Sequence, residues 1–244
     1  MSEYSKHFIA GLFSLALVLS AAAAVGTGGG AQARTMDFEP RISGEVFIST
    51  MQADGSPYLH DDWVKGDLLL LDGSLVRGQD VRYNGYLDAL IWRQPRSLQS
   101  VKVAKDMVRQ FVLYPPGPDS LVFQNITLRP WYESESVNLF AQILYKGEIS
   151  LVVHQRIRRT GETLESRGAR IISRPRIEHD PVFYVLMPDN EARELRRHSR
   201  RSLSRLFPEQ RTDVRAALRN EGVRINSQED LVRAIRVIDN LFFE

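Results

Sequence analysis

The chain has 244 residues, 43% hydrophobic and 25% charged, which is the composition of a globular protein. It contains no cysteine, and this excludes disulfides, thiolate catalysis and thiolate metal sites. The net charge is only +2, but arginine supplies all except five of the 32 basic residues, so the basic chemistry of this protein is guanidinium chemistry.

Residues 1–33 have the three parts of a secretory signal peptide. Lys6 precedes an uncharged apolar stretch at residues 8–25, and a Gly-rich segment then leads to Ala31-Gln32-Ala33. We expect cleavage after Ala33, and therefore a periplasmic or secreted protein with no transmembrane span. The alternative is a leader that is retained as an anchor, because the uncharged stretch is just at the lower length limit for a spanning helix.

Residues 34–42 are expected to be a linker, and residues 43–187 have the pattern of a β-rich domain. Short apolar or alternating runs are separated there by turn dipeptides that predict hairpins, namely Asp72-Gly73, Asn84-Gly85 and Lys146-Gly147. About ten strands at this spacing favour an antiparallel β sandwich or barrel. Between two of these strands, residues 158–168 are polar and predict a loop.

Residues 188–244 change to helical spacing and predict a three-helix C-terminal segment, so the expected fold class is α+β. The first helix is predicted from Asn190 to Phe207 and the second from Pro208, with Gly222 as its stop. Ser227 and Asp230 resemble a capping box at the start of the third. Helices of this size bury little alone, so we expect them to pack together and against the β domain.

The predicted first helix carries six arginines, which are Arg193, Arg196, Arg197, Arg200, Arg201 and Arg205. At about 100° per residue they fall on one arc, and the leucines fall on the other. The first five of these arginines form a candidate anion-binding patch; the alternative is a solvated helix face, the commoner role of basic runs. Residues 156–176 add seven arginines against two glutamates. Nucleic acid is disfavoured because the protein is expected to be exported and the run lacks stacking aromatics.

No residue pattern requires a catalytic, cofactor or metal site. Imidazole and carboxylate groups at His60, Asp61, Asp62, His179 and Asp180 are chemically able to share a metal, but their spacing does not demand it and turn formation explains them equally. Motifs for zinc peptidases, calcium loops and serine hydrolases are absent from the sequence. Trp63, Trp92 and Trp131 are candidates for the lining of a cleft, or for ordinary core residues.

Several segments resemble uncharacterised exported proteins of Bacteroidota-type bacteria. The segments are "GSPYLHDDWVKGDLLLLDGSLVRGQDVRYNGYLDALIW", "FAQILYKGEISLVVH", "SLSRLFPEQ" and "EDLVRAIRVI", and arginine stands here where lysine is usual in those proteins. The shared residues belong to turns, strands and helix caps. The resemblance therefore implies export, a β-rich architecture and a helical tail, and it assigns no catalytic residue.

These patterns predict an exported envelope protein that is a non-enzymatic binding or interaction module, without a cofactor, for an envelope protein or an anionic surface. The alternative is a periplasmic hydrolase, or a lipid- or ligand-binding β-barrel with an aromatic-lined cleft. A deep polar pocket that holds His60 with carboxylates favours the enzyme, whereas a filled core favours the module.

Overall fold

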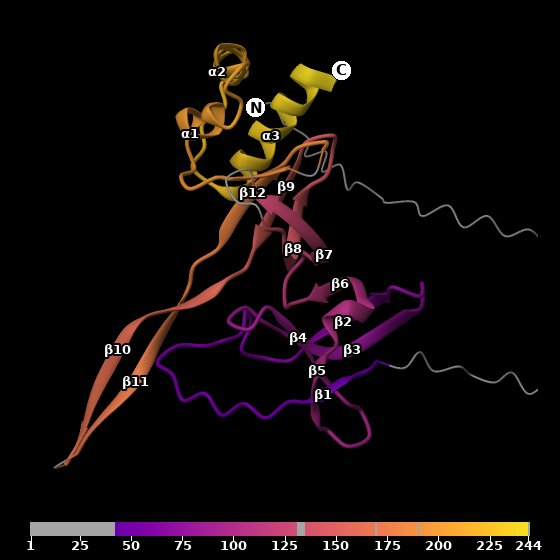
Figure 1. Cartoon of the computed structure of the whole chain (residues 1–244), viewed down its shortest axis with the longest axis vertical. Coiled ribbons are helices and arrows are strands. Elements are labelled where there is room, and N and C mark those ends of the chain that lie inside the picture. The colour runs from indigo at the N-terminus through magenta and orange to yellow at the C-terminus, as the bar shows by residue number, and fades with distance from the viewer. Residues whose placement is uncertain (1–41, 131–134, 169, 190, 244) are drawn as a thin grey trace, which may run out of the picture. The chain divides into compact units, whose positions relative to one another are not determined.

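The computed structural model describes residues 42–130, 135–168, 170–189 and 191–243 (Figure 1). The predicted signal peptide, nearly all of the predicted linker and Trp131 lie outside these residues. The described part is mostly β-structure followed by three helices, so the predicted α+β fold class is confirmed. None of its helices has both the length and the apolar character needed to span a bilayer.

The elements follow one another in this order along the chain. The strands are β1 (Gly44–Val46), β2 (Val64–Leu70), β3 (Leu75–Asn84), β4 (Ala89–Arg93), β5 (Ser100–Val103), β6 (Val108–Tyr114), β7 (Leu121–Pro130), β8 (Val137–Tyr145), β9 (Ser150–His154), β10 (Ile157–Arg167), β11 (Arg170–His179), β12 (Val182–Leu186) and β13 (Glu191–Glu194). The helices are the 3-10 turn η1 (Lys105–Met107), then α1 (Arg200–Arg205), α2 (Arg211–Asn220) and α3 (Gln228–Phe243).

Eleven of the strands form one sheet, in the order β1-β5-β4-β3-β2-β6-β7-β13-β12-β9-β8. Because β8 also pairs with β7, the five strands β7, β13, β12, β9 and β8 close into a barrel, and β1–β6 continue from β7 as an extension of the sheet. The pairing is antiparallel except between β13 and β7, which run parallel with Glu191 opposite Arg129. β10 and β11 form a separate two-stranded sheet.

The buried side chains form three separate cores, because successive side chains of a strand point to opposite faces of the sheet. Strand β9 is an example. Val152 points into the barrel with Leu139 and Ala141, whereas Leu151 and Val153 face the helices. The extension β1–β6 has its own core, built on Tyr83, Phe111, Phe123 and Phe140. Phe111 stacks on Phe123 with ring centroids 4.8 Å apart and meets Phe140 edge-on at 5.1 Å.

The three helices pack on the outer face of β9 and β12 through one shared core, which confirms the predicted packing of the tail. That core contains Ile149, Leu151, Phe183, Leu195, Leu203, Phe207, Val214, Leu218, Leu231, Ile235 and Ile238, among others. The buried carboxylate of Asp239 fastens α3 to the β8–β9 turn: it accepts hydrogen bonds from the Tyr145 hydroxyl (2.8 Å) and from the Ile149 amide (2.7 Å).

The turn and cap predictions at Ser227 and Asp230, Gly222 and Asn84-Gly85 are confirmed, whereas α2 begins at Arg211 and not at the predicted Pro208. Ser227 and Asp230 form the capping box of α3: the Asp230 amide donates to Ser227 Oγ (3.2 Å) and the Ser227 amide to Asp230 Oδ2 (3.1 Å). α2 ends at Asn220, and Gly222 adopts a φ of 62°, the left-handed conformation that stops helices. Asn84-Gly85 begins a hairpin turn, but the turn extends to Asp88, whose φ is 48°.

Two further sequence predictions are wrong. The helix predicted from Asn190 begins only at Arg200, because residues 191–194 form β13 and gain backbone partners in β12 and β7, which outweigh local helix propensity. The loop predicted at residues 158–168 is strand β10, paired along its length with β11. Polar residues lie on both exposed faces of that ribbon, so the apolar alternation typical of a strand is missing.

The close approach of Asp239 to Gly147 gives a test of the helix anchor. A Cβ atom at Gly147 would lie 1.9 Å from Asp239 Oδ2, so the carboxylate must move and its two hydrogen bonds must weaken. We expect Gly147→Ala to lower the free energy of unfolding by about 1–3 kcal/mol in denaturant titrations. The control is Gly161→Ala, where the added Cβ meets nothing within 4 Å. Equal stability of the two variants would contradict this anchor.

Candidate functional site

Four arginines line an open pocket of about 820 Å³ between β13 and α1. Its lining consists of Glu194, Leu195, Arg196, Arg197, Ser199, Arg201, Ser202, Arg205 and Leu206. We call this the arginine pocket. All four of its arginines are exposed, and its single acidic lining residue, Glu194, forms an ion pair with Arg196 (3.4 Å). Its volume falls in the range of about 300–1,000 Å³ that is usual for small-molecule sites.

The path of the chain after β13 brings these arginines together. The Leu195 amide donates to the Phe183 carbonyl of β12 (2.8 Å), and the His198 ring contacts the Phe183 ring edge-on at 4.4 Å. Ser199 then caps α1, with its Oγ accepting from the Ser202 amide (3.1 Å). Arg201 and Arg205 are one turn apart on α1 and therefore lie on the same face of the helix. That face lines the pocket together with Arg196 and Arg197, which belong to the segment between β13 and α1.

Three of the four charges in the arginine pocket have no acidic partner among the described residues. Within the part of the chain that the structure describes, Arg197, Arg201 and Arg205 form no ion pair. Side by side in one concavity, these guanidinium groups produce a positive potential that favours the entry of anions. The hydroxyls of Ser199 and Ser202 add polar groups, and the Leu206 side chain adds an apolar wall.

The arginine pocket differs from the patch predicted from the sequence at three positions. Arg193 is on β13 and is already occupied: its Nε pairs with Glu191 (2.5 Å) and its Nη1 donates to the Leu206 carbonyl, which ties the strand to the end of α1. Arg200 does not line the pocket, whereas Arg205 does. The patch was predicted on a continuous helix, and the interruption of that helix by β13 is the reason for these differences.

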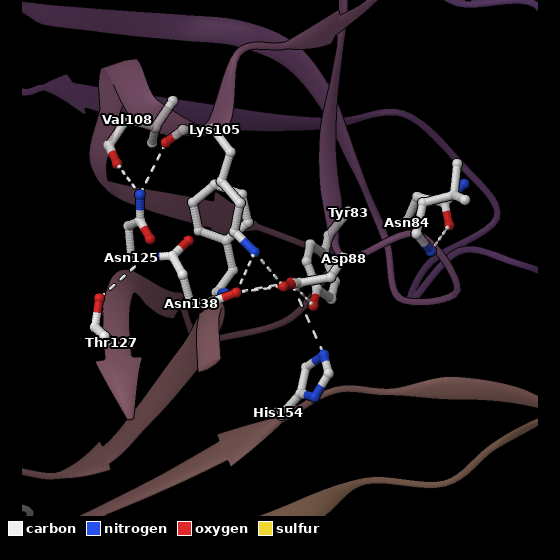
Figure 2. Close-up of polar contacts among 11 residues, drawn as sticks. Tyr83, Asn84, Asp88, Lys105, Val108, Asn125, Thr127, Asn138 and His154 are labelled. Atoms are coloured by element: carbon white, nitrogen blue, oxygen red, sulfur yellow. Dashed lines mark hydrogen bonds and ion pairs between the residues drawn. The ribbon is translucent and has the colours of Figure 1, made fainter. Parts of the chain in front are cut away.

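A second polar cluster lies around Asp88 in the β3–β4 turn (Figure 2). Its carboxylate accepts hydrogen bonds from the Tyr83 hydroxyl (2.8 Å) and from the Phe140 amide (3.2 Å), and it pairs with the Lys105 ammonium. His154 Nε2 lies 3.8 Å from Asp88 Oδ1. The Asp88 cluster thus joins the β3–β4 turn and the segment after β5 to barrel strands β8 and β9.

The electrostatics of the Asp88 cluster are those of a structural anchor. Burial, together with the negative charge of Asp88, raises the pKa of Tyr83, so its hydroxyl keeps the proton that it donates. Burial lowers the pKa of His154, and the attraction of Asp88 opposes this only in part, so the imidazole is neutral at pH 7. Lys105 also donates to the Asn138 carbonyl (2.9 Å). Asp88 and Lys105 therefore pair with each other, and the Tyr83 hydroxyl, the Phe140 amide and the Asn138 carbonyl supply their further hydrogen bonds.

The histidine and aspartate candidates are brought together only in part. Asp61 and His179 line one pocket of about 290 Å³, whose lining does not include His60, Asp62 or Asp180. His179 Nε2 lies 2.9 Å from the Gln155 side-chain oxygen. Asp180 is paired with Arg156 and Arg158, and burial lowers the pKa of His179. Among the described residues, no group of three or more metal-ligating side chains converges.

The two described tryptophans have their own partners in the extension of the sheet. The Trp63 ring lies beneath two guanidinium groups, with Arg82 Cζ 4.5 Å and Arg93 Cζ 5.1 Å from its centroid. Trp92 Nε1 donates to the Gln79 side chain (2.9 Å). Neither residue lines the arginine pocket or the pocket of Asp61 and His179.

Comparisons with known proteins did not identify a family for this chain. A scan against protein-family models found no match, and searches of curated proteins and of solved structures also returned no significant match. The resemblance to exported Bacteroidota proteins stays a prediction from the quoted segments.

Sequence analysis missed the Asp88 cluster, because its members are far apart in the chain and belong to no motif. His154 has the pattern of an ordinary strand residue, and Lys105 that of a surface lysine. A weak local indication was present at Asp88 itself, since aspartate is one of the few residues that tolerate a left-handed turn conformation.

Removal of the Asp88 carboxylate tests the anchor. Asp88→Ala leaves the partly buried Lys105 ammonium without its carboxylate and the Tyr83 hydroxyl without its acceptor. We expect the free energy of unfolding to fall by about 2–4 kcal/mol, between the losses usual for exposed pairs and for fully buried pairs. The control is Asp80→Ala, which removes more exposed pairs with Lys65 and Arg93 and should cost about 1 kcal/mol or less. A loss for Asp88→Ala no larger than the control would contradict the anchor.

Proposed function

We propose that this protein is a non-enzymatic binding module of the bacterial cell envelope, which holds an anionic ligand or surface in the arginine pocket. One observation carries the proposal: Arg197, Arg201 and Arg205 open into a single pocket without an acidic partner among the described residues. Its location in the periplasm or outside the cell is proposed from the leader sequence at residues 1–33.

The chemistry of guanidinium groups defines the class of ligand. Arginine presents planar pairs of N–H donors that match phosphate and carboxylate oxygens, and it stays charged at every physiological pH. Several such groups around one opening suit a ligand with more than one negative charge, such as a polyphosphate or a phosphorylated surface. Since the pocket is open to water, salt should weaken the binding strongly.

The filled interiors support a module rather than the alternative hydrolase or lipid-binding barrel. Leu128, Leu139, Ala141, Val152 and Ala192 occupy the inside of the five-stranded barrel. The aromatic core of the extension is equally closed, with Phe111, Phe123 and Phe140 fully buried. An enzyme would have to use Asp61 and His179, which line the pocket of about 290 Å³. His179 is hydrogen-bonded to Gln155, however, and the described lining of that pocket contains no second carboxylate.

Charge removal in the arginine pocket tests the proposal. We expect the triple variant Arg197→Gln, Arg201→Gln, Arg205→Gln to bind inorganic tripolyphosphate at least about tenfold more weakly than the wild type in low-salt calorimetry, because it loses three charge-assisted donors. Its thermal stability should change little, since exposed substitutions usually shift stability by about 0.5 kcal/mol or less each.

The matched control is Arg200→Gln, Arg219→Gln, Arg224→Gln. These three arginines are also exposed and lie in the same helical segment, but they do not line the pocket, and the net charge changes equally. Binding by the control should stay close to that of the wild type. An equal loss of affinity in both triple variants would show that tripolyphosphate is attracted by the net charge of the helical segment and not by the pocket, which would contradict the proposal. A wild type that does not bind tripolyphosphate would also overturn it.

A further inference from the structure

The β10–β11 hairpin forms a two-stranded arm that no pairing joins to the eleven-stranded sheet, and it runs outward from β9 and β12 (Figure 1). Asp54, which lies between β1 and β2 in the chain, braces the inner half of the arm. The Asp54 amide donates to the Pro175 carbonyl and the Ile177 amide to the Asp54 carbonyl, both at 2.9 Å, while the Thr163 hydroxyl donates to Asp54 Oδ2 (2.6 Å). Isolated two-stranded ribbons are marginally stable, so the outer half of the arm is suited to contact with another surface.

The register of the arm places its exposed apolar side chains on one face. Leu164 is opposite Ser173 and Ile171 is opposite Ser166, so these four side chains share a face. Leu164 is 68% exposed and Ile171 is 74% exposed. The opposite face carries charged side chains, including Arg174 paired with Glu165 (3.3 Å). The outer half of the arm is therefore amphipathic, and Glu162, which accepts a hydrogen bond from the Ser173 hydroxyl (2.6 Å), follows on the same face toward the base.

The charge of the arm selects an anionic partner. Residues 157–179 contain six arginines and only three glutamates. Each glutamate already has an arginine within the arm: Glu162 pairs with Arg159, Glu165 with Arg174 and Glu178 with Arg176. Arg158 pairs with Asp180 just beyond the arm, so the positive surplus over these four pairs is two arginines, and two copies of the arm would repel each other.

We propose that the arm is a membrane contact, in which Leu164 and Ile171 enter the headgroup region of an anionic lipid bilayer and the surplus arginines lie among its phosphates. A bilayer offers both negative charge and an apolar layer, which is the combination that an amphipathic basic element binds. Nucleic acid fits less well, because residues 157–179 contain no aromatic side chain for stacking on bases. The contact is shallow, since the open edges of a two-stranded ribbon must stay hydrated.

This inference goes beyond the arginine pocket and uses other residues, so the two proposals can fail separately. Because the chain has no cysteine, a single Leu164→Cys substitution can carry an environment-sensitive fluorophore at one known position. The control position is Leu71, which is 61% exposed in the β2–β3 turn. We expect a blue shift of the Leu164 label with vesicles of phosphatidylethanolamine and phosphatidylglycerol, little shift with phosphatidylcholine vesicles, and no shift of the Leu71 label with either.

A second pair of variants measures the contribution of the apolar face in the unlabelled protein. Leu164→Ser with Ile171→Ser should weaken co-sedimentation with the phosphatidylglycerol vesicles by at least about tenfold, because two aliphatic side chains no longer leave water. Leu71→Ser with Leu75→Ser, at two other exposed leucines, should leave it unchanged. Both pairs should still bind tripolyphosphate as the wild type does.

Three results would overturn the membrane contact. They are a wild type that does not sediment with the vesicles, a Leu164 label that does not shift when the protein is bound, and a Leu164 label that responds to duplex DNA instead of vesicles. If tripolyphosphate binding persists in any of these cases, the arginine pocket stands and the arm proposal alone is lost.

Discussion

The pairing of β13 with both β12 and β7 is the constraint on which the barrel and the arginine pocket depend. This short strand closes the ring of five strands and buries Ala192 completely. Its neighbour Arg193 points the other way and holds the carbonyl of Leu206, so the strand also fixes where α1 ends. The free energy gained from these non-local contacts outweighs the helix propensity of a segment rich in arginine, leucine and glutamate.

Barrel closure changes what the arginines can do. On an uninterrupted helix they would be spread over one solvated face. Because the chain leaves β13 at Glu194 and turns before α1, Arg197 and Arg201 come from different local structures and face a shared opening. The Asp88 cluster fixes the extension of the sheet, because it joins the β3–β4 turn to the barrel strands through an ion pair and hydrogen bonds within the protein. The charges of Asp88 and Lys105 thus have partners inside the protein, whereas Arg197, Arg201 and Arg205 of the arginine pocket are exposed to solvent.

The features that the sequence predicted are those with local physical causes. The capping box at Ser227 and Asp230, the left-handed stop at Gly222 and the hairpin at Asp72-Gly73 each depend on residues a few positions apart. β13 depends on its pairing with β7, which is far away in the chain, and β10 is exposed on both faces, so neither strand has an apolar period to detect. Asp88, Lys105 and His154 meet only through the fold. The candidate site was predictable as a run of arginines, but its shape was not.

The central claim is that particular arginines, rather than the basic segment as a whole, receive an anion. The most direct measurement is a nuclear magnetic resonance titration of the arginine Nε–Hε signals with tripolyphosphate. The account predicts that the signals of Arg197, Arg201 and Arg205 shift together and saturate, while those of Arg193, which is bound to Glu191 and Leu206, and of Arg200 stay in place. Small shifts of equal size over all exposed arginines, without saturation, would contradict it.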